Sequence, residues 1–234
     1  MIASADGCKA GWLVAVADGW PRRKAPQLHV CKDFQELLKW TGSCEVVVVD
    51  IPIGLPEGKE PRLCDLQARK KLGKGGSNRV FLAPPREALG AKTAKRFQTL
   101  HKRLTDKGAG LPVWGIVPKL READDAMTPK QQERVFEFHP ELAWARRAGG
   151  VLASKHGAIG ALQRLKLLEQ QNAIWLSEIS DSSLLESVKL DDLLDAIVGL
   201  AVAEDLRRKT NPPYRLPAKN PPRDAQGLRM EIWY

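Results

Sequence analysis

The sequence is poor in the residues that build a disulfide or zinc framework. Among 234 residues there are four cysteines, and none belongs to a C-x-x-C pair. They are Cys8, Cys31, Cys44 and Cys64. Such irregular spacing indicates neither a zinc site nor a set of disulfides, so we expect reduced thiols.

Long apolar runs are also missing. No stretch approaches the roughly 20 apolar residues needed to span a bilayer. The opening MIASADG has neither the basic nor the apolar region of a secretory signal. We therefore expect a cytoplasmic protein. Its 43% hydrophobic and 28% charged residues are typical of a folded domain.

Three common catalytic loop motifs do not occur. The glycines match neither G-x-x-x-x-G-K-[ST] nor G-x-G-x-x-G, so a loop that cradles phosphates is not indicated. The sequence also lacks G-x-S-x-G, which leaves Ser-His-Asp catalysis without support.

Positive charge is concentrated in one segment. Residues 59–107 carry 14 Lys and Arg against 4 Asp and Glu, a net +10, whereas the whole chain carries +9. The rest is close to neutral. A basic segment that also contains Phe81 and Phe97 is typical of a surface that contacts phosphates, although a solvated helical face is the alternative.

The order of patterns predicts an α/β fold with a mixed sheet. Strands are predicted at 2–6, 12–17, 28–31, 45–52 and 135–139, with an edge strand at the C-terminus. Helices are predicted at 34–40, 62–73, 93–104, 161–171 and 191–206, and residues 111–118 read as an apolar connector. We expect a single domain over 1–234 with an insertion at about 55–130.

Two carboxylates follow predicted strands. Asp6 ends the first strand, in ADG, where Asp before Gly is also a turn signal. Asp50 ends the valine run VVVVD, at the carboxyl edge where open α/β sheets place ligands. A turn before Pro52 is the alternative role for Asp50.

The last predicted helix carries carboxylates on one face. Asp192 and Asp195 are spaced i, i+3, and Asp191 neighbours Asp195 at i, i+4. A dipole role at the helix start explains Asp191 and in part Asp192. Asp195 fits it less well, because Gly199 on the same face predicts that this face packs inward. Gathered carboxylates hold Mg²⁺ or Mn²⁺ in phosphoryl-transfer enzymes.

Glu137 and His139 alternate onto one face of VFEFH. Glu137 is a further candidate metal ligand, whereas His139, before Pro140, either joins the site or orients the turn.

Seven motifs together resemble domain-of-unknown-function family 429, a family of predicted nucleases with a ribonuclease H-like fold. The motifs are DGCKAGW (6–12), VVDIPIGLP (48–56), RLCDLQAR (62–69), PKLREAD (118–124), EFHPE (137–141), DDLLDAI (191–197) and GLRMEIWY (227–234). The resemblance implies a mixed five-stranded sheet flanked by helices, with the basic insertion after the fourth strand.

The resemblance also implies the roles of four acids. Asp6 and Asp50 match the acids of the first and fourth strands, and D-x-x-D-A at Asp192, Asp195 and Ala196 looks like the last-helix signature of RuvC-type resolvases. In those enzymes four acids hold two metal ions. Asp50 replaces the longer Glu of the resolvases.

Six basic residues, four of them within the motifs, are candidate substrate contacts. They are Lys9, Arg62, Arg69, Arg86, Lys119 and Lys155. For Arg62 and Arg69 the alternative is an ordinary helical ion pair with Asp65, and for the others a solvated side chain.

We therefore expect a Mg²⁺- or Mn²⁺-dependent nuclease acting on DNA or RNA through Asp6, Asp50, Asp192 and Asp195. One alternative is a nucleic-acid-binding protein without turnover. Another is a nucleotide phosphotransferase of the same broad fold class, which would need a second lobe and glycine-rich phosphate turns.

Overall fold

The computed structural model describes residues 1–21, 24–171, 183–209 and 214–234. The chain divides into two compact units. The first contains Met1–Asp50, Arg134–Tyr214 and Trp233–Tyr234; the second contains Ile51–Glu133 and Arg215–Ile232. The predicted insertion at about 55–130 thus lies in the second unit, together with a stretch near the C-terminus.

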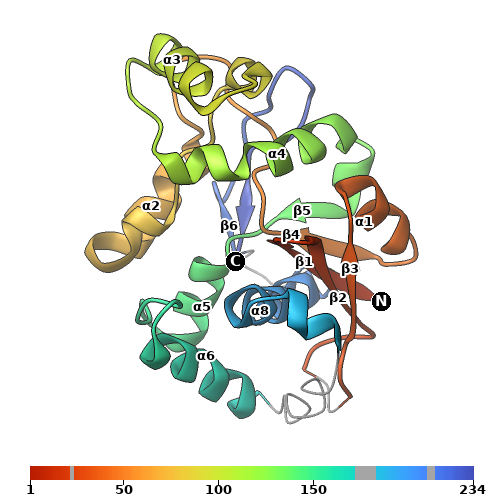
Figure 1. Cartoon of the computed structure of the whole chain (residues 1–234). Coiled ribbons are helices and arrows are strands. Elements are labelled where there is room, and N and C mark those ends of the chain that lie inside the picture. Colours follow the sequence, from red (N-terminus) through yellow and green to blue (C-terminus); the bar gives the residue numbers. More distant parts are fainter. Residues whose placement is uncertain (22–23, 172–182, 210–213) are drawn as a thin grey trace. The chain divides into compact units, whose positions relative to one another are not determined.

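A five-stranded sheet in the order β3-β2-β1-β4-β5 forms the centre of the first unit (Figure 1). Its strands are β1 (Ile2–Cys8), β2 (Gly11–Ala17), β3 (Gln27–Cys31), β4 (Val46–Val49) and β5 (Val135–Glu137). β1 to β3 pair antiparallel, whereas β4 lies parallel to both β1 and β5. The predicted α/β fold with a mixed sheet is confirmed.

The valine run behaves as its composition predicts. All four valines of β4 are buried, and the strand lies between two parallel neighbours. Continuous β-branched residues suit a strand covered on both faces, because neither face needs polar side chains. The carboxyl end of β4 therefore lies inside the sheet, beside β1, and Asp50 follows it directly.

Helices flank this sheet. They are α1 (Phe34–Trp40), α5 (Pro140–Ala148), α6 (Ala158–Gln170) and α8 (Leu190–Arg207), with a short 3₁₀ turn at Ser183–Ser187. α8 packs against β1, β2 and β4, and every residue from Leu193 to Glu204 is buried. A helix so apolar around its circumference belongs in a core, which makes each carboxylate on it notable.

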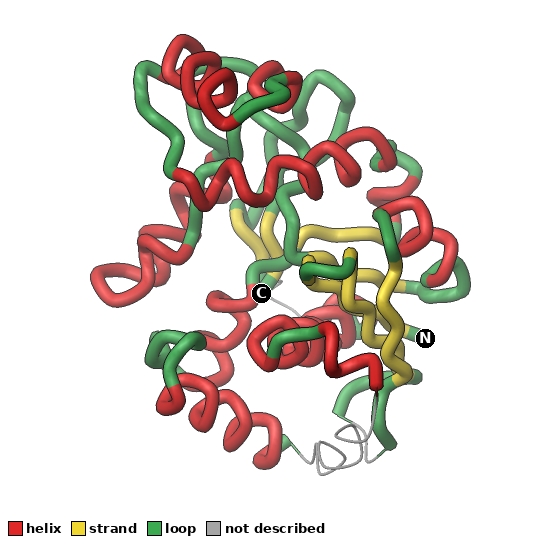
Figure 2. Tube along the Cα trace, viewed as in Figure 1, coloured by secondary structure: helices red, strands yellow, loops and turns green. Residues whose placement is uncertain are grey.

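The second unit consists mainly of helices and loops (Figure 2). Its helices are α2 (Leu63–Gly76), α3 (Ala94–Thr105) and α4 (Leu111–Ala126), with 3₁₀ turns at Ser77–Arg79, Arg86–Gly90 and Gln131–Glu133. Strand β6 (Arg215–Leu216) pairs with β7 (Ile232–Trp233), whose first residue belongs to this unit.

Residues 111–118, an apolar connector whose structure the sequence left open, form the first half of α4. Pro112 lies in the first turn, where its missing N–H has no helical partner to lose. Pro118 lies inside the helix and removes one backbone hydrogen bond there. The buried side chains of Val113, Val117 and Leu120 compensate through packing.

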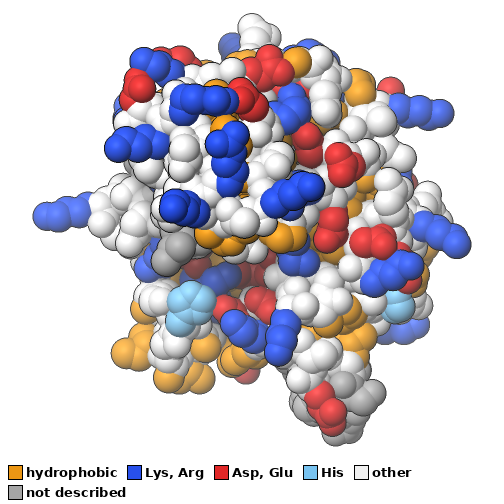
Figure 3. Space-filling view, turned by 45° about the horizontal axis from the view of Figure 1, so that its top comes forward, with side chains coloured by type: hydrophobic (Ala, Val, Ile, Leu, Met, Phe, Trp, Pro, Cys, Tyr) orange, Lys and Arg blue, Asp and Glu red, His pale blue; other side chains and the backbone are white. Residues whose placement is uncertain are grey.

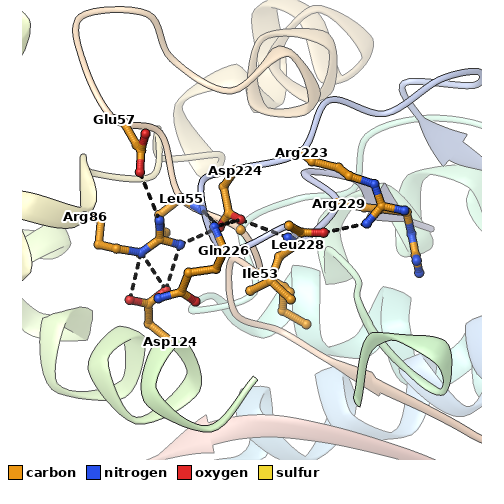
Figure 4. A network of polar contacts seen from close by, with 12 residues as sticks. Ile53, Leu55, Glu57, Arg86, Asp124, Arg223, Asp224, Gln226, Leu228 and Arg229 are labelled. Atoms are coloured by element: carbon orange, nitrogen blue, oxygen red, sulfur yellow. Dashed lines mark hydrogen bonds and ion pairs between the residues drawn. The ribbon is translucent and has the colours of Figure 1, made fainter. Parts of the chain in front are cut away.

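A buried carboxylate ties the C-terminal stretch into the second unit (Figure 4). The Asp224 side chain is fully buried and accepts backbone N–H bonds from Leu55 at 3.1 Å and from Gln226 and Leu228 at 2.9 Å each. It also forms an ion pair with Arg86.

Among the residues described, no helix is both long and apolar enough to cross a membrane.

Candidate functional site

The two strand-end carboxylates lie on neighbouring strands. Ala5 of β1 is paired with Val49 of β4 in the parallel ladder, so Asp6 and Asp50 each follow a paired residue. The Asp50 N–H bonds to the Ala5 carbonyl at 3.0 Å, which continues the ladder by one step. The sheet itself therefore sets these acids side by side, 44 residues apart in sequence.

A close helix–strand contact places the third acid. A Cβ atom at Gly199 would lie 1.8 Å from the Ser4 hydroxyl oxygen, so only glycine lets α8 approach β1 this closely. Asp195 lies one turn before Gly199 on the same face and is completely buried. The prediction that this face packs inward is confirmed.

Asp195 meets a cation and an indole. Its Oδ2 accepts a hydrogen bond from the Lys155 ammonium, which is also an ion pair, and its Oδ1 accepts one from Trp144 Nε1–H at 2.9 Å. Both carboxylate oxygens thus have a donor. Asp6 Oδ1 accepts the backbone N–H of Gly7 at 2.7 Å.

The charges of the cluster act on each other. Burial raises the pKa of Asp6 well above its usual value, and the nearby charges of Asp50 and Asp195 raise it further. Burial raises the pKa of Asp50 to about 8, although Lys155 opposes the shift. Burial also raises the pKa of Asp195, again against Lys155. Asp192 is half-buried, and its pKa is raised by burial and by Asp191.

Lys155 is the cation that balances this cluster. Burial alone would lower its pKa, but the charges of Asp195, Asp6 and Asp50 raise it, so the ammonium stays charged. We expected Lys155 to contact substrate phosphate, whereas its ammonium is bound to Asp195. The residue lies in the loop between α5 and α6, 40 positions before its partner, and its sequence neighbourhood gives no sign of this pairing.

Glu137 and His139 lie near the cluster on β5 and at the start of α5. Glu137 is 5% exposed, and its charge contributes to the raised pKa of Asp50. The backbone of His139 precedes α5 and donates its N–H to the Trp233 carbonyl at 3.1 Å.

A buried arginine that the sequence did not single out organises the loop that carries Lys155. Arg164 is completely buried, forms an ion pair with Glu141 at 2.6 Å, and donates to the carbonyls of Ala153 at 3.1 Å and Gly160 at 2.9 Å. In sequence, Arg164 resembles any polar residue of an amphipathic helix. Glu141 also contributes to the raised pKa of Asp50.

The donor chemistry of the cluster suits a hard divalent cation, because carboxylate oxygens are the ligands that Mg²⁺ prefers. In the described residues, however, the side chains of the cluster are not arranged as a complete set of metal ligands. Over residues 1–21, 24–171, 183–209 and 214–234, no three His, Cys, Asp or Glu side chains are placed to hold a metal ion. The Lys155 ammonium supplies positive charge at Asp195 instead.

The sequence of this chain matches one family model over most of its length. The model of the family "Protein of unknown function (DUF429)" matches residues 5–220, which include all four candidate acids. The chain belongs to the DUF429 family. Searches of the curated proteins and of the solved structures gave no match.

In the DUF429 chain, the motif arginine Arg62 has a structural role. Its side chain is 1% exposed and pairs with the equally buried Asp65. Its Nη1 donates to the carbonyls of Ile53 at 3.2 Å and Gly54 at 3.1 Å. The ion-pair alternative therefore accounts for Arg62, whose guanidinium is turned to protein rather than to a substrate.

The remaining basic candidates of the DUF429 chain differ in exposure. Arg86 is 20% exposed and is bound by Asp124, Asp224 and the exposed Glu57 (Figure 4). Arg69 and Lys119 are half-buried, and Lys9 is exposed. Lys9 is thus the most accessible of these candidates for substrate contact, and Arg86 belongs to the Asp224 network.

Proposed function

We propose that this protein is a divalent-metal-dependent nuclease with a ribonuclease H-like fold. One observation carries the proposal. Acids from three elements that are distant in sequence gather at one sheet edge closely enough for each to shift the pKa of another. Lys155 supplies one positive charge against the carboxylates of Asp6, Asp50 and Asp195, and buried carboxylates are costly unless positive charge balances them.

The strand order supports the fold part of this proposal. Three antiparallel strands are followed by two parallel ones, in the order β3-β2-β1-β4-β5. The first and fourth strands carry Asp6 and Asp50, and the last long helix carries Asp192 and Asp195. This is the distribution of acids that the resemblance to RuvC-type resolvases implies.

Asp6, Asp50, Asp192 and Asp195 would hold Mg²⁺ or Mn²⁺, with Glu137 as a fifth candidate. When bound, such ions lower the pKa of an attacking water and stabilise the leaving oxygen of a phosphodiester. The chain itself supplies orientation. The Trp144 indole fixes the Asp195 carboxylate, and the Gly199–Ser4 contact fixes the height of α8 above the sheet.

The second unit would supply affinity for a nucleic-acid backbone. Apart from Arg62, Arg69, Arg79 and Arg86, the basic residues of 59–107 are exposed. Figure 3 shows Lys and Arg side chains standing out over the face that it draws. Exposed cations of this density give binding that weakens steeply with salt, because bound phosphates release their counterions.

A second candidate function is nucleic-acid binding without turnover, and the Lys155–Asp195 ion pair favours it. If the ammonium stays in place, the carboxylates are balanced by the chain itself and need no ion. The two functions differ in one respect: only the first requires divalent metal to change a substrate.

Cleavage assays test the proposal. The protein is incubated with single-stranded, duplex and branched DNA and RNA, with Mg²⁺, with Mn²⁺ or with chelator. Asp195→Asn should reduce cleavage by more than the roughly 10–100-fold that loss of a supporting residue costs at a metal site. Asp18→Asn is the matched control, because Asp18 is exposed in the same unit.

Full cleavage by Asp195→Asn, with unchanged circular dichroism, would refute the nuclease proposal. Salt-sensitive binding without cleavage of any substrate under either metal would establish the second function instead.

A further inference from the structure

The second unit contains a cavity of about 250 Å³. It is bounded by the loop 56–61, by Arg69 of α2, by residues 81–85, by the end of α3 and by the loop that leads into α4. It shares no lining residue with the carboxylate cluster. Its volume lies just below the usual range of ligand pockets, roughly 300–1,000 Å³, and suits a small ligand.

The walls combine apolar surface with positive charge. Phe81, Leu82, Val113 and three prolines supply the apolar part. Lys59, Arg69 and Lys107 supply three cations and Glu60 one carboxylate. Lys59 is paired with the exposed Asp106, so Arg69 and Lys107 contribute most of the net positive charge. A pocket of this composition favours a ligand that has both a flat apolar body and a negative charge.

Arg69 is the cation that points most directly to a ligand. It is half-buried, and its Nε–H donates to the Val80 carbonyl at 2.7 Å, which fixes the plane of the guanidinium. Within the described part of the chain, its two terminal nitrogens form no hydrogen bond or ion pair. The other two arginines considered as substrate contacts, Arg62 and Arg86, both pair with carboxylates.

The terminal nitrogens of Arg69 are not among the buried polar atoms that lack a hydrogen-bond partner, so solvent reaches them. An anion seated in the cavity could therefore bind a guanidinium whose plane is already fixed. The planar donor fork of arginine suits phosphate oxygens in particular.

His101 adds a polar side chain to the wall of the cavity. His101 Nδ1 lies 2.9 Å from the Lys107 carbonyl and 3.1 Å from Thr105 Oγ1, and because a carbonyl can only accept, the first contact favours the tautomer with the proton on Nδ1. The neutral ring then has an acceptor at Nε2. His101 is 9% exposed and lines the cavity, so this acceptor is held in one orientation.

We propose that this cavity binds a nucleoside phosphate, with the phosphate on Arg69 and the base against the Phe81 wall. The same chemistry has two possible sources, a free nucleotide or one nucleotide of a single strand. Stacking of a base on an aromatic side chain tolerates any base, so we expect little selectivity among bases.

Calorimetric titration of the full-length protein in chelator tests this site without any contribution from divalent metal. The titrants are adenosine and cytidine 5′-monophosphates, the matching nucleosides and inorganic phosphate. The monophosphates should bind at least tenfold more tightly than either part alone. Equal binding of nucleoside and nucleotide would overturn the phosphate assignment, and equal binding of inorganic phosphate would overturn the base assignment.

Two arginine variants separate the cavity from general charge. Arg69→Met should weaken nucleotide binding about tenfold or more, the effect of losing a hydrogen bond to a charged group. Arg96→Met is the matched control, because Arg96 is exposed on α3 of the same unit and does not line the cavity. An equal loss in both variants would show general electrostatic attraction and refute the site.

A third variant keeps the test decisive if Arg69→Met does not fold. Phe81→Leu should weaken nucleotide binding while leaving phosphate binding unchanged, and no effect on nucleotide binding would refute the base assignment. Comparing a 5′-phosphorylated oligothymidylate with thymidine 5′-monophosphate identifies the source. Tighter binding of the oligomer that still depends on Arg69 indicates a strand, and tighter binding of the monomer indicates a free nucleotide.

Discussion

Replacing Lys155 by Met is the most informative single change at the carboxylate cluster. It removes the ammonium from a completely buried carboxylate but keeps most of the apolar stem. Breaking a buried ion pair by removing one partner costs about 3–5 kcal/mol, because the remaining charge has no compensation. The Lys155 side chain is 26% exposed, so water screens part of the interaction and we expect about 3 kcal/mol at neutral pH.

The loss of unfolding free energy caused by Lys155→Met should be smaller at low pH. Burial raises the pKa of Asp195, and removal of Lys155, which lowers it, will raise it further. A carboxyl group with a raised folded-state pKa binds its proton more readily in the folded protein than in the unfolded one. Its destabilising effect is therefore absent below the unfolded pKa, about 3.9, and grows as pH rises toward the folded pKa. The cost of Lys155→Met should shrink as pH falls toward 4.

Urea denaturation at pH 7.5 and pH 4.5 measures both effects. Lys166→Met is the matched control, since Lys166 is exposed on α6 and should change the unfolding free energy by no more than about 0.5 kcal/mol. In an Asp195→Asn background, Lys155→Met should cost less, because the carboxylate that pairs directly with the ammonium is already gone. A loss at pH 7.5 no larger than that of Lys166→Met would refute the account of Lys155 as the internal counter-charge.

Three further predictions concern packing, the buried network and metal binding. Gly199→Ala should lower the unfolding free energy by about 1–3 kcal/mol in urea denaturation, because its Cβ would lie 1.8 Å from the Ser4 oxygen; Gly150→Ala, which meets nothing within 4 Å, should not. Asp224→Ala should cost about 3 kcal/mol by the same measurement, because Arg86 loses its most buried carboxylate partner and three backbone N–H groups lose their acceptor; a cost below about 1 kcal/mol would contradict the network. Mn²⁺ titrations from pH 6 to 9 should show affinity rising up to about tenfold per unit and levelling above about pH 8, since the pKa of Asp50 is about 8 and its carboxyl must lose a proton to bind metal. Affinity independent of pH would exclude Asp50 as a ligand.

Local patterns predicted the sheet and the positions of the acids. The valine run at 46–49 specifies a strand covered on both faces, and the aliphatic surroundings of Asp195 specify a buried helix face. Both follow from side-chain spacing along one element, which sequence displays directly. The closeness of Asp6 and Asp50 could be predicted as well, because neighbouring parallel strands end at the same edge of a sheet.

The partners of those acids could not be predicted in the same way. Lys155 reaches Asp195 from a loop whose shape depends on the buried Arg164, and neither side chain differs in sequence from an ordinary solvated cation. Asp224 likewise resembles a turn residue but is a buried acceptor for Arg86. Such contacts depend on how distant segments pack, and no single-element pattern records them.

The Asp224 network also determines how the second unit could be produced as a separate fragment. A fragment ending at residue 133 would keep all three of its long helices, yet it would leave Arg86 without its buried acid and the Leu55 amide without an acceptor. It would also lose the backbone of Arg229, which exchanges hydrogen bonds with the Gln132 side chain. Stable excision of this unit therefore requires residues 215–232 to be rejoined through an engineered linker or supplied as a separate peptide.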